Sequence, residues 1–200
     1  RIAGKGAHGA FPDQGVDPVV IAGELILALQ SVVSRNISPT QTAVLSITQV
    51  HAGDAYNVIP GTAHLAGTVR TFSMQVMGHI EQRVDDLVKG ICAAHGATGN
   101  LDFRTIFHPV VNEPAVTDLA AGVCDELVGA GNVIRSSQPG TGSEDFSFMT
   151  ERVPACYLIL GNGEDSSPLH NHDYDFNDEA LVYGASFFAR IVEASLGVKS

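Results

Sequence analysis

The loop Ser167–Asp178 has the side chains of a metal-binding segment. His170 and His172 lie beside the carboxylates Asp173 and Asp175. Neutral imidazole is a good ligand for zinc or manganese, and its second ring nitrogen is usually held by a carboxylate or a carbonyl. His170 is therefore a candidate metal ligand, with Asp173 and Asp175 as candidates to orient its ring. The alternative is a surface histidine with no role.

The other histidines give weaker signals. In an extended loop alternate side chains point to opposite sides, so His172 should point away from His170. A second ligand is one interpretation of His172, but exposure to solvent is the favoured one. The rest have no partner at ligand spacing, and we expect them to be structural or exposed: His51, His64, His79, His95 and His108. One ligand does not complete a metal site, which suggests that the 200 residues are part of a larger protein.

The Gly-rich loop Pro139–Asp145 is a candidate anion site. It leads into a predicted short helix that begins at Ser143. Backbone amides at a helix start can hold a carboxylate or an oxyanion. Gly142 and Glu144 are therefore candidate substrate-binding residues. Glu144 and Asp145 can equally be first-turn acids favoured by the helix dipole. The loop lacks the Gly-Lys-Ser/Thr ending of a phosphate loop.

Composition and charge exclude several classes of protein. The net charge of −11, with only 11 Lys and Arg in 200 residues, argues against nucleic acid as a partner. We expect no membrane partner, since no apolar run of about 18–20 residues stands out. No signal peptide is visible. Three distant cysteines in apolar surroundings, Cys92, Cys124 and Cys156, predict buried thiols and a cytoplasmic location.

The first region, 1–109, predicts a βαββαβ order. A helix begins at Pro18 after the cap Asp17, and a second helix ends at His95-Gly96. Strands are predicted at about 1–8, 43–50, 62–72 and 101–107. The expected apolar stripes are Val19, Ala22, Ile26, Leu29 and Val33 in the first helix, and Met77, Ile80, Val84, Leu87, Val88 and Ile91 in the second. This α+β pattern is typical of a ferredoxin-like sandwich, with two helices on one face of a four-stranded sheet.

The second region, 110–200, begins after the prolines around 109–114. It predicts helices at about 116–130, from Ser143 and at 178–196, with strands at 132–135 and 155–160. The run Cys156–Leu160 is continuously apolar, as in a strand covered on both faces. Two strands cannot make such a sheet, so the missing strands are expected upstream of Arg1.

Five motifs resemble one known family in order and spacing. They are Gly4–Pro12, Gly53–Pro60 with Asn-Val-Ile-Pro, Gly67–Phe72 with Gly-Thr-x-Arg, Gly142–Phe146 and Pro168–Asp178. Together they resemble the zinc-dependent aminoacylase/carboxypeptidase family, which includes hippurate hydrolases and auxin-conjugate amidohydrolases. The hippurate hydrolase and N-acyl-amino-acid amidohydrolase branch is the most similar.

The resemblance implies a two-domain enzyme. Residues 1–109 would form a ferredoxin-like lid that makes a homodimer, and 110–200 the C-terminal part of an α/β catalytic domain. The family's other metal ligands and its general-base carboxylate lie upstream of the lid. The 200-residue chain alone is therefore expected to be inactive.

The resemblance also assigns roles to individual residues. His170 corresponds to the last metal ligand. His8 corresponds to a catalytic histidine that reaches across the dimer and donates a hydrogen bond to the scissile carbonyl oxygen. Asn57 and Arg70 correspond to residues that bind the substrate carboxylate. The alternatives are a turn histidine for His8, a turn former for Asn57 and an exposed, acid-paired strand residue for Arg70.

The activity implied is metal-dependent hydrolysis of the amide bond of N-acyl amino acids, with hippurate-like substrates. Two divalent ions, zinc or manganese, would activate a bridging water. Two alternatives stay open. One is a non-catalytic fragment that dimerises and binds substrate. The other is a carboxypeptidase-type peptidase of the same family.

Overall fold

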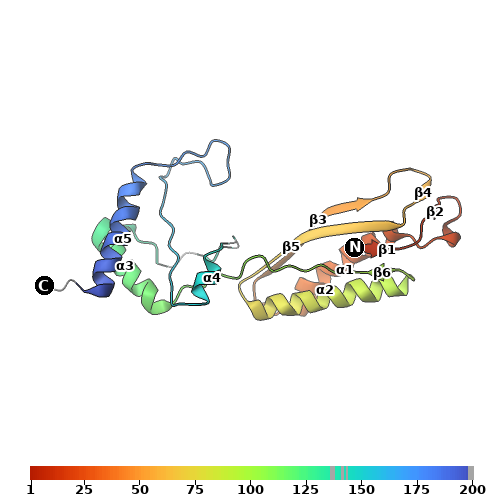
Figure 1. Ribbon diagram of the computed structural model, residues 1–200, viewed down its shortest axis with the longest axis horizontal. Coiled ribbons are helices and arrows are strands. Elements are labelled where there is room, and N and C mark those ends of the chain that lie inside the picture. Colours follow the sequence, from red (N-terminus) through yellow and green to blue (C-terminus); the bar gives the residue numbers. More distant parts are fainter. Residues whose placement is uncertain (136–137, 141, 143, 198–200) are drawn as a thin grey trace. The chain divides into compact units, whose positions relative to one another are not determined.

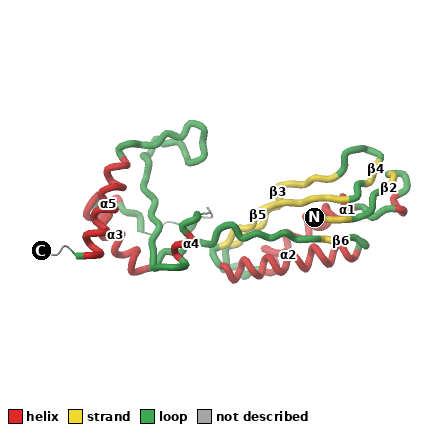
Figure 2. Tube along the Cα trace, in the orientation of Figure 1, coloured by secondary structure: helices red, strands yellow, loops and turns green. Residues whose placement is uncertain are grey.

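The computed structural model describes residues 1–135, 138–140, 142 and 144–197. The chain divides into two compact units, Arg1–Pro109 and Val110–Ser200. The first combines a sheet with two long helices. In the second, the described regular elements are helices joined by long loops (Figure 2).

A four-stranded antiparallel sheet forms the centre of the first unit (Figure 1). In spatial order the strands are β3 (Ala43–Ala52), β5 (Thr62–Thr71), β1 (Ile2–Ala3) and β6 (Thr98–Gly99). β3 is an edge strand, and it pairs with β5 over nearly the whole length of both. A separate small sheet pairs β2 (Ala7–His8) with β4 (Val58–Ile59).

Two helices, α1 (Pro18–Asn36) and α2 (Met74–Ala94), cover one face of this sheet. α1 begins where the sequence predicts, and both helices have a side-chain cap at their start. The Asp17 carboxylate accepts a hydrogen bond from the Val19 amide at 2.8 Å, and the Ser73 hydroxyl accepts one from the Val76 amide at 3.4 Å. Gly96 has a φ of 73°, a left-handed conformation that ends α2. The opposite face of the sheet carries no helix of this unit.

The core between helices and sheet is apolar and closely packed. Its buried members are Ile2, Ile21, Ala22, Leu25, Leu29, Val32, Ala63, Val76, Ile80, Val84, Val88 and Cys92. The predicted stripe of α2 is largely confirmed. The predicted stripe of α1 is confirmed at Ala22 and Leu29, which are buried, but Val19 is 47% exposed. Ile21, Leu25 and Val32, which the stripe did not include, are buried as well. α1 is apolar on most sides, so its periodicity did not determine its orientation.

The apolar character of α1 also reaches the level of a membrane span by length and composition. An 18-residue window of the helix has a mean hydropathy of 1.4. The expectation that no apolar stretch of this length exists is therefore wrong. Packing accounts for much of the apolarity, since Ile21, Leu25 and Leu29 are buried in the core of the unit.

Two predictions about strands in the first unit are wrong. The first predicted strand is split, because Lys5 exchanges two backbone hydrogen bonds with Val16 and the chain then pairs with β4 as β2. The predicted strand 101–107 is irregular. The amide of Asn100 donates to the carbonyl of Arg1, and beyond this bond the described chain offers no partner strand.

Two predicted strands of the second unit are also irregular. At 132–135 the chain follows a short 3-10 turn, η2 (Ala130–Asn132). At 155–160, the Glu113 amide donates to Ala155, and the Asn112 side chain bonds the backbone N–H and C=O of Tyr157. No other described segment forms a β-ladder with residues 155–160. The second unit instead joins α3 (Pro114–Val128) and α5 (Ala180–Leu196), with a one-turn helix α4 (Ser147–Thr150).

The bulge in the β3–β5 ladder generates a prediction about stability. The register shifts between Ile47 and Gln49, and a Cβ added at the opposing Gly67 would overlap the carbonyl oxygen of Ser46. Gly67→Ala should therefore lower the free energy of unfolding by about 1–3 kcal/mol through overpacking. Chemical denaturation followed by far-UV circular dichroism measures the change.

Gly78→Ala is the matched control. Gly78 lies in α2, and an added Cβ meets nothing within 4 Å. This substitution should raise the free energy of unfolding by about 0.5–1 kcal/mol, because alanine favours the helix. Equal effects at the two positions would contradict the packing described for the bulge.

Candidate functional site

His8 and Asn57 lie next to each other at one end of the first unit. In the β2–β4 pair, His8 is opposite Val58, and the Gly9 amide donates to the Asn57 carbonyl at 2.7 Å. Both residues are exposed. The short strands are held by the turn after His8 and by the loop Gly53–Asn57, so the sequence motifs that contain them meet in space.

The backbone fixes the tautomer of His8. The Ala10 amide donates a hydrogen bond to Nδ1 of His8 at 3.1 Å. A ring nitrogen that accepts a hydrogen bond carries no proton, so the proton of the neutral imidazole lies on Nε2. The Phe11 ring packs against the imidazole, with centroids 5.6 Å apart. His8 therefore presents an Nε2–H donor, which is the group that the proposed role requires.

Arg70 lies at the other end of the long ladder. It pairs with Val44 near the end of β5, whereas Ala63, seven residues earlier, pairs with Ala52 just before the loop of Asn57. At 3.3 Å per residue this separation is roughly 23 Å. Within one copy of the chain, Asn57 and Arg70 cannot bind the same small carboxylate.

His170 has an unusual backbone. Its φ is 66°, the one positive value among the described non-glycine residues. It lies in a turn closed by the Asn171 amide, which donates to the Pro168 carbonyl at 3.2 Å. The left-handed conformation costs a histidine about 1–2 kcal/mol, and such strain is common at functional sites.

The predicted carboxylate partners of His170 are placed elsewhere. The Asp173 carboxylate lies 3.2 Å from Nε2 of His172, and the described contact of Asp175 is its carbonyl, which accepts from Asn162. The His172 side chain is 88% exposed, as expected. Across the described ranges, no group of three or more His, Cys, Asp or Glu side chains could hold a metal ion. His170 can supply one ligand only.

Glu144 belongs to a small polar cluster. The Tyr157 hydroxyl donates to its carboxylate at 2.7 Å, and this bond raises the pKa of Tyr157 above its ordinary value. The Phe146 ring packs against that of Tyr157, with centroids 5.5 Å apart. The expected helix start at Ser143 lies outside the described residues, and α4 begins at Ser147. Gly142 is exposed, and its loop conformation beside Thr141 and Ser143 is not described.

Several contributing residues carry weak or no sequence signals. Nothing in the sequence indicates that the Ala10 amide and the Phe11 ring fix His8. Asn112, which holds Tyr157 through two bonds at 2.8 and 2.9 Å, lies between Pro109 and Pro114 and resembles an ordinary turn residue. An Asn just before a predicted helix could have suggested a backbone contact, but not its partner.

Comparison with known proteins gives a consistent result. The model of Peptidase family M20/M25/M40 matches residues 10–194. The chain is 35% identical to hippurate hydrolase of Campylobacter jejuni over 96% of its length and 50% of that protein. It is 36% identical to N-acetylcysteine deacetylase of Bacillus subtilis, covering 95% of the chain and 49% of the relative.

A solved structure agrees with these relatives. The YXEP protein of Bacillus subtilis, a dinuclear metal binding peptidase from the M20 family, has a TM-score of 0.73 and 26% identity. The match covers 95% of this chain and 48% of that one. The chain thus spans about half the length of the relatives it matches. With the family model covering nearly all of it, the chain belongs to Peptidase family M20/M25/M40.

Proposed function

We propose that the intact protein hydrolyses the amide bond of N-acyl amino acids, with hippurate-like compounds as substrates. The observation that carries the proposal is the exposed Nε2–H donor of His8, fixed by the Ala10 amide and adjacent to Asn57. An amide carbonyl gains negative charge when water attacks it, and a positioned donor stabilises that charge. Hippurate hydrolase and N-acetylcysteine deacetylase are relatives whose names support this substrate class.

A divalent metal would supply the activated water in this reaction. The dinuclear peptidase among the similar structures supports two ions, and we propose zinc or manganese. From this chain we assign His170 as a metal ligand, since its imidazole is exposed and its backbone is held in a strained turn. The chain alone is proposed to be inactive, because its described residues offer no complete metal site.

We also propose that the first unit is a ferredoxin-like lid through which two copies form a dimer. The strand order β3-β5-β1-β6, with both helices on one face, supports the fold. Among the described strands none pairs with the outer edge of β3, and such an edge is the usual place for pairing with another strand. On the neighbouring helix α1, Val20 is 59% and Leu27 is 76% exposed. These apolar side chains fit a second copy of the chain.

A dimer also resolves the separation of the substrate-binding residues. If two copies pair antiparallel along β3, the His8 and Asn57 end of one copy approaches the Arg70 end of the other. Asn57 could then contribute an amide, and Arg70 a bidentate guanidinium, to one substrate carboxylate. His8 would donate to the scissile carbonyl in the site to which its partner contributes Arg70. The charge and direction of these donors suit a substrate with a free carboxylate.

The first prediction concerns His8. In the intact protein, His8→Ala should lower kcat for hippurate by about 10²–10³-fold with a smaller change in KM, because the lost hydrogen bond acts mainly on the transition state. Steady-state kinetics of hippurate hydrolysis measure this. His172→Ala is the control, since His172 is exposed in a loop and should leave both constants unchanged. A wild-type kcat in the His8→Ala variant would contradict the catalytic role proposed for His8.

The second prediction concerns the dimer. Leu27→Asp should convert the protein to a monomer in sedimentation measurements, because a buried carboxylate would oppose the contact. His79→Asp, on the exposed side of α2, should leave the oligomeric state unchanged. Both variants should fold, since both positions are exposed in the single chain. A wild-type protein that sediments as a monomer at micromolar concentration would contradict the proposal.

A further inference from the structure

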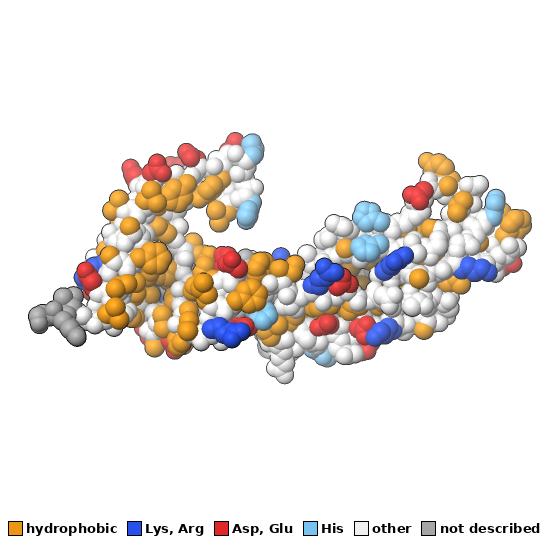
Figure 3. All heavy atoms as spheres, in the orientation of Figure 1, with side chains coloured by type: hydrophobic (Ala, Val, Ile, Leu, Met, Phe, Trp, Pro, Cys, Tyr) orange, Lys and Arg blue, Asp and Glu red, His pale blue; other side chains and the backbone are white. Residues whose placement is uncertain are grey.

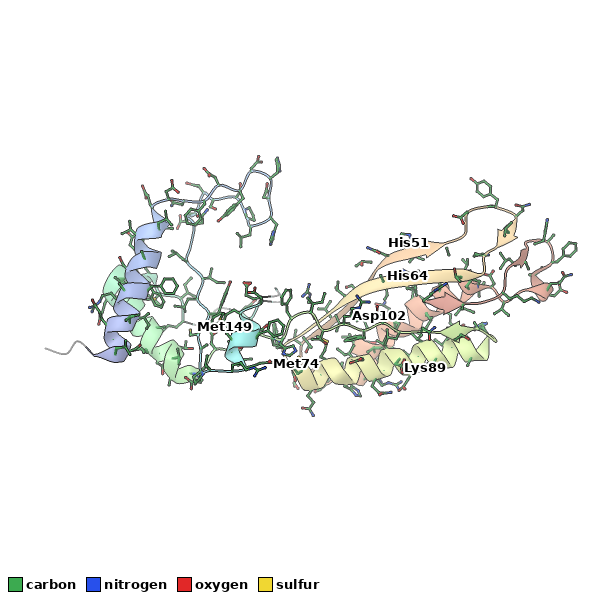
Figure 4. All side chains as sticks on the ribbon, viewed as in Figure 1. His51, His64, Met74, Lys89, Asp102 and Met149 are labelled. Atoms are coloured by element: carbon green, nitrogen blue, oxygen red, sulfur yellow. The ribbon has the colours of Figure 1, made fainter. Side chains whose placement is uncertain are left out.

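We propose that His51 and His64 form a transition-metal site on the face of the sheet opposite α1 and α2, a site that does not use His170. The two residues are directly opposite each other in the β3–β5 ladder. Directly opposite side chains point to the same face of the sheet, with Cβ atoms about 4.5–5.5 Å apart. Figure 4 shows the two labelled side chains next to each other on adjacent strands.

The surroundings leave both imidazoles available. Ala63 and Leu65, which flank His64 on β5, pack into the core, so His64 lies on the face that α1 and α2 do not cover. Both histidines are exposed. Within the described ranges, no hydrogen bond or ion pair engages either ring, and the ring contact of each is with the other. Neither imidazole therefore has to give up an existing partner to bind a ligand.

The ring geometry is close to that of a two-imidazole chelate. The centroids are 6.5 Å apart and the ring planes differ by 31°. Metal–nitrogen bonds of about 2.0–2.1 Å require centroids about 5–6 Å apart. A small rotation about the side-chain torsions of two exposed residues closes this difference. Water molecules would complete the coordination.

The donor set selects the class of ion. Two neutral nitrogen ligands favour Cu²⁺, Ni²⁺ and Zn²⁺ over Mg²⁺ and Ca²⁺, which prefer oxygen. A bound ion would cross-link edge strand β3 to β5, one residue before the last pair, Ala52–Ala63, and close to the loop Gly53–Asn57. An ion that binds the folded chain but not the unfolded chain stabilises the folded state. The site would therefore clamp the end of the ladder that carries Asn57.

Calorimetric titration of the chain with Ni²⁺ tests the site. His51→Asn and His64→Asn should each weaken one binding event by at least tenfold, and Mg²⁺ should give no such event. His172→Asn is the control, because it removes an exposed histidine from the second unit. Unchanged Ni²⁺ affinity in both strand variants would overturn the proposal.

A second measurement needs no variant. Trace Cu²⁺ should broaden the ring-proton resonances of His51 and His64 before those of His8 or His170 in the NMR spectrum. Earlier broadening of His8 or His170 would also overturn the proposal. Neither experiment measures amide hydrolysis, so both test the metal site independently of the proposed function.

Discussion

The length of the β3–β5 ladder is the constraint on which the remaining features of the first unit depend. It keeps the two parts of a potential substrate site apart, with His8 and Asn57 beyond one end and Arg70 near the other. The ladder is held rigidly, because one of its faces packs against α1 and α2 through buried side chains such as Leu25, Val32 and Ile80. A flexible hinge that could bring the two ends together is not part of this fold.

In a single copy of the chain, several groups of this fold have no described partner to bind or to pack against. Among the described strands none pairs with the outer edge of β3, and α1 exposes Leu27. His8 is held in one tautomer by a backbone amide, although no described residue of its own copy accepts a hydrogen bond from Nε2. The second unit likewise exposes apolar side chains, among them Ile159 and Phe188 (Figure 3). These are features that a larger assembly would use.

Sequence patterns predicted the elements whose information is local. The Asp17 cap is predictable because side-chain capping depends on neighbouring residues, and the stripe of α2 is amphipathic enough to fix its orientation. α1 is apolar on most sides, so its orientation depends on the sheet that it covers. The predicted strands at 101–107 and 155–160 have suitable composition, but a strand also requires a partner, and composition does not supply one.

In the candidate site, too, local features were predictable from the sequence and tertiary contacts were not. The residue types and the motifs pointed to His8, Asn57, Arg70 and His170. The motifs did not predict how far apart these residues lie in space. The separation of Asn57 from Arg70 and the Tyr157–Glu144 hydrogen bond depend on tertiary structure, which the motifs do not describe. The strained φ of His170 is equally invisible in the sequence.

Mixing two impaired variants of the intact protein tests most directly whether the site is shared between copies. Alone, His8→Ala should turn over hippurate slowly and Arg70→Ala should bind it weakly, so each should have little activity at low substrate concentration. In a mixed dimer, one site would combine both substitutions and the other neither. With random exchange of subunits, half of the dimers are mixed and have one working site, so about a quarter of wild-type hippurate hydrolysis should return. No recovery, in mixtures shown by mass spectrometry to contain mixed dimers, would contradict a site shared across the β3 edge.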